Sequence, residues 1–181
     1  YDHGLNILGA NGIDIGPKGP RVAFRKLNGT ISYQTGLRMF GHQLTYAGLV
    51  RGQFAFTNLF PAERMSIGGS STVRGFRDDG ISGRSGFFTR QQINFPLVSL
   101  GMWTKPLGPT SISTFFAYDA GGILPDVDDA FERGFVQAAS VGLRGQNQYI
   151  TSELTLSKTL SSPQFVRSSN FAMIGTVRLN F

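Results

Sequence analysis

The side chains that most often perform catalysis are scarce in this chain. It contains no Cys and only two His, at positions 3 and 42. His3 lies in an expected strand and His42 in an expected tight turn, and a Ser-His-Asp triad would have to use one of them. A zinc site would lack ligands, because protein zinc sites are built mainly from Cys and His. The sequence therefore predicts neither an enzyme nor a bound metal or cofactor.

Two segments remain as candidates for ion binding. Residues 68–71 read Gly-Gly-Ser-Ser, but no Lys follows at the spacing of a phosphate-binding loop. An acidic segment could hold Ca²⁺, but it lacks the Gly and the spacing of an EF-hand, so a solvated external loop is favoured. Its carboxylates are those of Asp126, Asp128, Asp129 and Glu132.

Apolar and polar residues alternate along most of the chain, which is the period of β-strands with two different faces. In 171–181 the odd positions read Phe, Met, Gly, Val, Leu, Phe and the even ones Ala, Ile, Thr, Arg, Asn. About eleven residues is the length of a tilted membrane-spanning strand. No segment shows a helical period. We expect eight strands, at 1–10, 23–37, 44–56, 87–97, 112–121, 135–146, 149–160 and 171–181.

The composition points to a membrane barrel. Of 181 residues, 40% are hydrophobic and 15% charged, with 24 Gly and 16 Phe. Soluble domains carry about 25% charged residues, and a helical membrane protein would need runs of about 18 apolar residues that are absent here. One face of each expected strand is apolar and uncharged, and the other is small and polar. We therefore predict an all-β, antiparallel transmembrane β-barrel with a water-filled lumen, rather than a soluble sandwich.

The positive charge of the chain is scattered. A formal net charge of +6 could indicate an acidic partner. The basic residues, however, occur singly along the expected strands instead of clustering. We predict no nucleic-acid partner, and expect outer-membrane lipid around the apolar face.

Long and short connections alternate along the chain. The long ones are 11–20, 57–85, 121–134 and 161–170, whereas 38–43 and 146–148 are tight. This alternation is expected when one rim faces the cell exterior and the other the periplasm. The last strand would then end at Phe181 on the periplasmic side. Tyr1 falls inside an expected strand, so we expect the chain to be part of a longer protein.

The longest connection carries the most specific motif. Val73-Arg74-Gly75-Phe76 follows Ile67-Gly68-Gly69 after a short spacer. This segment resembles the signature loop of the Omp85 superfamily. It is most similar to the two-partner secretion transporters (TpsB), the hemolysin secretion/activation proteins of the ShlB/FhaC/HecB family.

Three further segments match the same family in order. The segment 118–122 (YDAGG) resembles an Asp-x-Gly motif on an inward-facing strand, and 138–145 (AASVGLRG) resembles the following conserved strand. The final Phe181 resembles the signal by which the barrel assembly machinery recognises its substrates. The resemblance implies that 1–181 is the C-terminal half of a sixteen-stranded barrel. It also implies preceding POTRA domains, of which this sequence shows none.

The resemblance assigns roles to residues of the motif. It implies that the loop 57–85 folds into the lumen as a lid, where Arg74 pairs with Asp119. The alternation independently places Asp119 on the polar face of its strand. Gly75 would allow a tight turn near the wall, and Phe76 would pack against inner residues. Supporting motif residues are Gly68, Gly69 and Gly121. A solvated loop cation at Arg74 and an ordinary lumen carboxylate at Asp119 remain the alternatives.

The implied function is an outer-membrane pore that needs no ATP. It would secrete, and in some members activate, an exoprotein with an N-terminal secretion domain, such as a hemolysin or adhesin. One alternative is an Omp85-type factor that inserts other barrel proteins. Another is a complete eight-stranded structural or adhesive barrel, against which the long loop argues.

Overall fold

The computed structural model describes residues 2–3, 24–39, 41–76, 80–100, 110–125, 133–166 and 171–180. Side chains are described throughout these ranges except at 2–3 and 98–100. Nearly all of the regular structure is β, with one short 3-10 helix, η1 (Pro61–Glu63), among the described residues. No helix in these ranges is long and apolar enough to cross a membrane.

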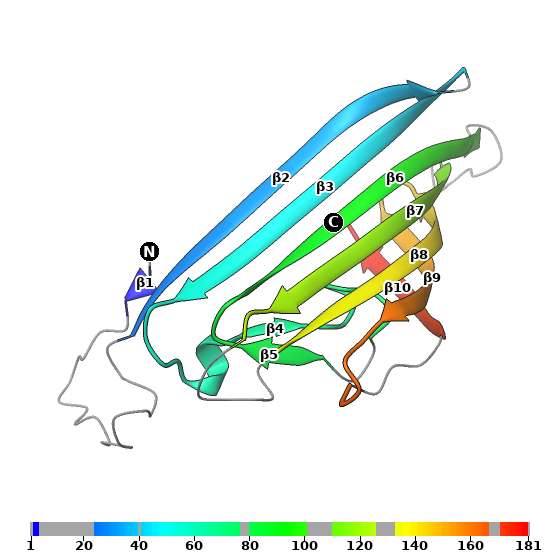
Figure 1. Ribbon diagram of the computed structural model, residues 1–181. Helices are drawn as coiled ribbons and strands as arrows, with labels where there is room; N and C mark the ends of the chain where they lie inside the picture. The colour runs from blue at the N-terminus through cyan, green and yellow to red at the C-terminus, as the bar shows by residue number, and fades with distance from the viewer. Residues whose placement is uncertain are drawn as a thin grey trace.

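Eight strands form one antiparallel sheet in which neighbours along the chain are neighbours in space (Figure 1). A small two-stranded sheet, β4 with β5, is inserted between β3 and β6. From β2 to β10 the large sheet's strands run from 9 to 15 residues, long enough to cross a bilayer at a tilt. The strands are β1 (Asp2–His3), β2 (Arg25–Met39), β3 (His42–Ala55), β4 (Met65–Ile67), β5 (Ile81–Gly83), β6 (Gly86–Leu100), β7 (Thr110–Ile123), β8 (Gly134–Gln146), β9 (Ile150–Ser161) and β10 (Phe171–Leu179).

The prediction of an antiparallel all-β sheet is confirmed, with strand bounds close to those expected. The predicted strand 1–10 is described only at Asp2–His3, which pairs with β2, and the rest lies outside the described residues. The sheet is curved and open: among the described strands no pairing joins β10 to β1. The hairpin β4–β5 inside the long connection was not predicted, because three-residue strands carry too little periodicity to detect.

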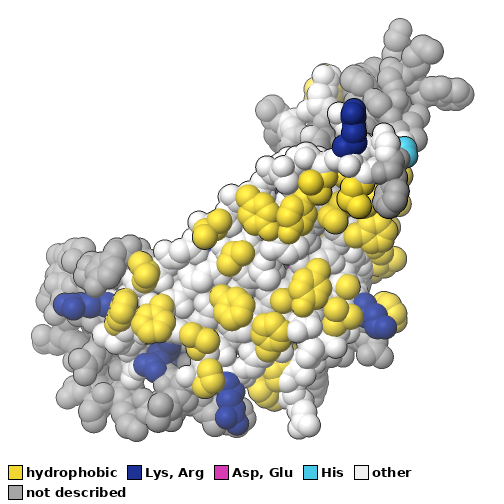
Figure 2. All heavy atoms as spheres, turned by 45° about the horizontal axis from the view of Figure 1, so that its top comes forward, with side chains coloured by type: hydrophobic (Ala, Val, Ile, Leu, Met, Phe, Trp, Pro, Cys, Tyr) yellow, Lys and Arg dark blue, Asp and Glu magenta, His cyan; other side chains and the backbone are white. Residues whose placement is uncertain are grey.

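The large sheet has an outer and an inner face. The outer face carries exposed apolar side chains on every strand from β2 to β10. Figure 2 shows them scattered over the broad area between the ends of the strands, with Lys and Arg toward those ends. Examples are Ile31, Val50, Phe87, Phe116, Val141, Leu156 and Met173.

The outer face is not wholly apolar and uncharged, contrary to the expectation. The hydroxyls of Tyr33 and Tyr46 both donate to Gln91 Oε1, at 2.7 and 2.6 Å. Lys158 is exposed there, with its Nζ 5.8 Å from the centroid of the Phe171 ring. A polar group at such a position is tolerated when a neighbouring side chain satisfies it, and the alternation of residue types alone does not reveal such a neighbour.

The inner face also departs from expectation. It was predicted to be small and polar, yet Phe88 and Phe115 are on it and are 5% and 0% exposed. They lie on the same faces of β6 and β7 as Arg90 and Asp119, because alternate residues of a strand share a face. These aromatic rings are buried by the long connection between β3 and β6, which fills part of the inner face.

The long connection between β3 and β6 lies at one end of the sheet, and the turns between β2 and β3 and between β8 and β9 lie at the other (Figure 1). Between β2 and β3 the chain reverses at Gly41, whose φ is +78°. Between β8 and β9, Asn147 accepts hydrogen bonds from the backbone N–H groups of Tyr149 and Ile150. The hairpin β4–β5 lies beneath the sheet, near the end that carries the connection between β3 and β6 (Figure 1).

Candidate functional site

The connection between β3 and β6 is fixed to the sheet at its base. Gln53 Nε2 donates to the backbone carbonyls of Glu63 and Arg84, at 3.0 Å each. Lys26 Nζ lies 2.8 Å from Glu63 Oε2. These contacts come from β2 and β3 and hold both arms of the loop near the end of the strands. Both ends of the loop are therefore fixed to the sheet at the point where the loop turns toward the inner face.

An apolar cluster then packs the loop against the inner face. Ile67, Val73, Phe76 and Ile81 are at most 2% exposed. Each fully buried side chain of this kind contributes about 1.5–3 kcal/mol, against about 1 kcal/mol for an ordinary hydrogen bond. Apolar burial is thus the main source of docking free energy. The wall supplies Phe88 from β6, Ile123 from β7, and Val136 and Ala138 from β8.

Glycines shape this contact. Gly121 on β7 leaves room for the loop, since a Cβ there would lie 2.8 Å from Ile67 Cγ2 and 2.9 Å from Phe88 Cβ. Gly69 and Gly75 adopt φ values of +94° and +102°, which L-residues rarely occupy. Gly68 is bonded through both its N–H and its carbonyl to the Thr72 hydroxyl. The turn that begins at Gly68 is therefore stabilised by hydrogen bonds within the loop as well as by its contacts with the wall.

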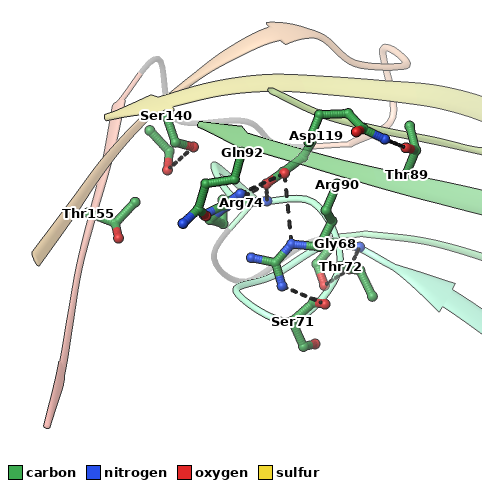
Figure 3. Close-up of polar contacts among 12 residues, drawn as sticks. Gly68, Ser71, Thr72, Arg74, Thr89, Arg90, Gln92, Asp119, Ser140 and Thr155 are labelled. Atoms are coloured by element: carbon green, nitrogen blue, oxygen red, sulfur yellow. Dashed lines mark hydrogen bonds and ion pairs between the residues drawn. The ribbon is translucent and has the colours of Figure 1, made fainter. Parts of the chain in front are cut away.

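Arg74 and Asp119 meet at the tip of the loop (Figure 3). Arg74 Nε donates to Asp119 Oδ2 at 2.7 Å and Nη2 donates to Oδ1 at 2.9 Å. The backbone N–H of Arg74 adds a third bond to Oδ2 at 3.1 Å. Arg74 is 4% exposed and Asp119 is fully buried. A guanidinium fork suits a carboxylate because both donors can be aligned at once.

Two further residues of the wall, one on β6 and one on β7, contact the Arg74 guanidinium. Its Nη1 donates to Gln92 Oε1 at 2.9 Å. Its guanidinium also lies 5.6 Å from the centroid of Phe115, and that of Arg144 lies 5.7 Å from the same ring. Arg144 is in turn paired with Glu153 at 2.6 Å. Phe115 therefore contacts two arginines, each with its own carboxylate.

The tip also rests on β8 and β9. Thr159 Oγ1 donates to the Gly75 carbonyl at 3.2 Å. A Cβ at Gly75 would lie 3.1 Å from Ala138 Cβ and 3.6 Å from Ser157 Cβ. Gly75 therefore packs closely against small residues of β8 and β9. Within this one turn the loop contacts four adjacent strands, β6 to β9.

Open space remains beside the docked tip. A cavity of about 700 Å³ lies between the tip and the inner faces of β6, β8, β9 and β10. Its wall is polar and carries Arg90, Arg144, Glu153 and Arg178. The loop narrows the inner side of the sheet without filling it.

Most of the residues singled out from the sequence lie in this contact. Val73 and Phe76 lie in the apolar cluster, Arg74 and Gly75 form the tip, Gly68 and Gly69 form the preceding turn, and Asp119 and Gly121 belong to the wall. Phe181 and the acidic segment lie outside the described residues. Within the described ranges, no group of three or more His, Cys, Asp or Glu could hold a metal.

Sequence reasoning missed Gln92, Phe115 and Arg90. Phe115 lies on the same face of β7 as Asp119, which the sequence did identify, and Gln92 lies on the same face of β6 as Arg90. Their roles depend on which loop atoms lie above them, and no spacing within a strand reports that. Arg90 was seen only as one of the scattered basic residues.

Comparisons with known proteins agree with one another. The family model of the haemolysin secretion/activation proteins ShlB/FhaC/HecB matches residues 1–145. Outer membrane transporters CdiB of Dickeya dadantii (strain 3937) and Escherichia coli are each 27% identical over all of this chain. The chain spans 31% and 29% of their lengths, so about a third of each relative is represented.

Solved structures give the same result. CdiB from Escherichia coli superimposes with a TM-score of 0.80 at 25% identity, over 97% of this chain and 32% of that one. CdiB from Acinetobacter baumannii superimposes with a TM-score of 0.69 at 22% identity, over 86% of this chain and 27% of that one. The second likeness concerns the fold alone.

Proposed function

Because the chain belongs to the haemolysin secretion/activation family ShlB/FhaC/HecB, we propose that it forms the C-terminal part of an outer-membrane β-barrel that translocates a partner protein. The partner would be an exoprotein carrying an N-terminal secretion domain, captured by periplasmic domains of the same transporter. The similarity to outer membrane transporters named CdiB supports this location and activity. Translocation through such a pore requires no catalytic residue and no cofactor.

One observation carries the proposal: the loop docks inside the curved sheet by a buried ion pair. A buried pair is not needed for stability, since apolar replacements are often as stable. It does define one docked position, because Arg74 must reach Asp119 with both donors aligned. We propose that the loop 57–85 is a lid in the lumen, and that release of Arg74 from Asp119 opens the path for an unfolded chain.

Outer-membrane lipid and the barrel assembly machinery are the other partners in this proposal. The exposed apolar outer face supports contact with lipid, because patches of this extent are otherwise covered by a partner. Recognition by the assembly machinery through Phe181 is part of the proposal on sequence grounds.

Secretion of the cognate exoprotein tests the proposal. We expect Arg74→Ala and Asp119→Ala to reduce secretion strongly while the barrel still reaches the outer membrane. The charge-reversed pair Arg74→Asp with Asp119→Arg should recover part of the loss, because the two opposite charges would again face each other. Arg51→Ala, which removes an exposed inner-face cation, serves as the matched control. Normal secretion by both single variants would exclude a role for this contact.

A further inference from the structure

Asp119 has a second cation beside it. Arg90 Nε lies 3.8 Å from Asp119 Oδ1 (Figure 3). The two residues are directly opposite each other on β6 and β7. Arg90 therefore belongs to the wall, whereas Arg74 belongs to the loop. Any movement of the loop separates Asp119 from Arg74 but leaves Arg90 in place.

Among the described residues, the loop provides every short bond to this carboxylate. Arg74 Nε, Nη2 and backbone N are the three donors within 3.1 Å of Asp119. All three depart together when the tip withdraws. A neighbouring opposite charge stabilises a carboxylate, so a cation on the wall that takes the place of Arg74 would raise the population of the undocked state.

Arg90 is itself held by the docked loop. Its Nη1 donates to the Ser71 carbonyl at 3.1 Å. When the loop leaves, this acceptor leaves with it, and Nη1 of Arg90 becomes available for another hydrogen bond. The same movement that exposes Asp119 thus frees the neighbouring guanidinium to bond it.

We propose that Arg90 is the reserve counter-ion of Asp119, which replaces Arg74 each time the loop undocks. Arg90 is a positioning residue: it sets the balance between the docked and undocked loop by keeping the Asp119 carboxylate paired in both. The proposal extends the lid function above to a specific residue, and its readouts are loop exposure and barrel assembly rather than secretion. Failure of one proposal is therefore distinguishable from failure of the other.

A simpler role makes the opposite prediction. If Arg90 only clamps the loop through the Ser71 carbonyl, its removal frees the loop. If Arg90 is the reserve counter-ion, its removal penalises the undocked state, because Asp119 then has no cation beside it once Arg74 has withdrawn.

Thiol labelling separates the two roles. Val73 belongs to the docked loop and is fully buried against the wall. The 181 residues contain no Cys, so Val73→Cys introduces a single thiol into them. In the intact protein we expect Arg90→Gln to slow maleimide labelling of this thiol roughly tenfold. Arg51→Gln is the matched control and should leave the rate unchanged. Equal or faster labelling in Arg90→Gln would overturn the proposal.

Barrel assembly provides a second, independent test. With Arg74→Ala alone, Arg90 still pairs Asp119, and we expect the barrel to assemble. Combining Arg74→Ala with Arg90→Gln leaves the carboxylate without a cation, and heat-modifiable barrel in the outer membrane should fall at least tenfold. Adding Asp119→Asn should restore it, because the stranded charge is then gone. Normal assembly of the double variant, or no recovery with Asp119→Asn, would refute the idea.

Discussion

Asp119 is the buried charge around which the inner face is arranged. It receives three hydrogen bonds from Arg74 and lies opposite Arg90 on the next strand. Phe115, four positions before Asp119 on β7 and on the same face, contacts the guanidinium groups of Arg74 and Arg144. An aromatic face attracts such cations most strongly where water is excluded. At the scale of single residues, the site is a charged network supported by one ring.

Replacing Phe115 should weaken this network. Phe115→Leu removes both contacts with guanidinium groups, each about 0.5–2 kcal/mol, and uncovers Gly142, against which the ring packs. We expect the free energy of unfolding to fall by roughly 2–4 kcal/mol. The temperature at which the barrel unfolds, followed by its mobility in gels, measures the change. Phe116→Leu is the control, because Phe116 is on the outer face and 56% exposed. An equal effect from both substitutions would contradict the prediction.

Gly75 should tolerate no side chain. Its φ of +102° is strained for any L-residue, and a Cβ would lie 3.1 Å from Ala138 Cβ. We expect Gly75→Ala to weaken docking of the loop by about 1–3 kcal/mol, detected as faster proteolysis within the loop. Gly29→Ala is the matched control, since a Cβ at Gly29 meets nothing within 4 Å. If the two variants are cleaved at the same rate, steric fit at the tip does not hold the loop.

At the scale of elements, the loop between β3 and β6 behaves as a small folded unit. Its strands β4 and β5 and the turn between them bury an apolar face against β6, β7 and β8. Hydrogen bonds from Gln53 hold its base. The apolar contacts supply most of the docking free energy, and the ion pair selects the docked position.

This division of labour is open to measurement. We expect Phe76→Ala to increase labelling of a Val73→Cys thiol more than Asp119→Asn does, because removing a buried Phe costs about 3–5 kcal/mol. Phe54→Ala on the outer face, where the ring is 50% exposed, should leave labelling unchanged. A larger effect from Asp119→Asn would show that the charges, rather than the apolar cluster, hold the loop down.

At the scale of the whole molecule, the described strands form an open, curved sheet. Its outer face is apolar, and β10 has no partner on its far side among the described strands. An unpaired strand edge is costly in hydrocarbon, where no water can satisfy its N–H and C=O groups. The sheet therefore needs further strands to close it within a membrane.

The chain on its own should consequently fail to form a monomeric barrel. We expect the 181-residue polypeptide, refolded into detergent or lipid vesicles, to associate through its strand edges. Cross-linking and light scattering would detect the association, and the intact protein under the same conditions is the control. A stable, protease-resistant monomer of the 181-residue chain would contradict this expectation and favour an independent small barrel.

Much of this structure was readable from residue types along the chain. Strict alternation defined seven of the long strands to within a few residues, because each strand separates lipid-like from polar surroundings. The same alternation put Asp119 on the inner face. The long connection stood out by its length alone. These features depend only on residues close together in the chain, so they can be predicted without knowledge of the fold.

The sequence by itself thus determined the class of fold, the positions of the long strands along the chain and the inner face as the place of Asp119. Only the tertiary structure decided that Phe88 and Phe115 point inward, that Lys158 and the Tyr33–Gln91 contact lie outside, and that Arg90 stands beside the ion pair. The physical reason is that these arrangements depend on contacts between segments distant in the chain. A loop that covers the inner face turns it from wetted wall into packed interior, and no periodicity within a strand records what lies above it.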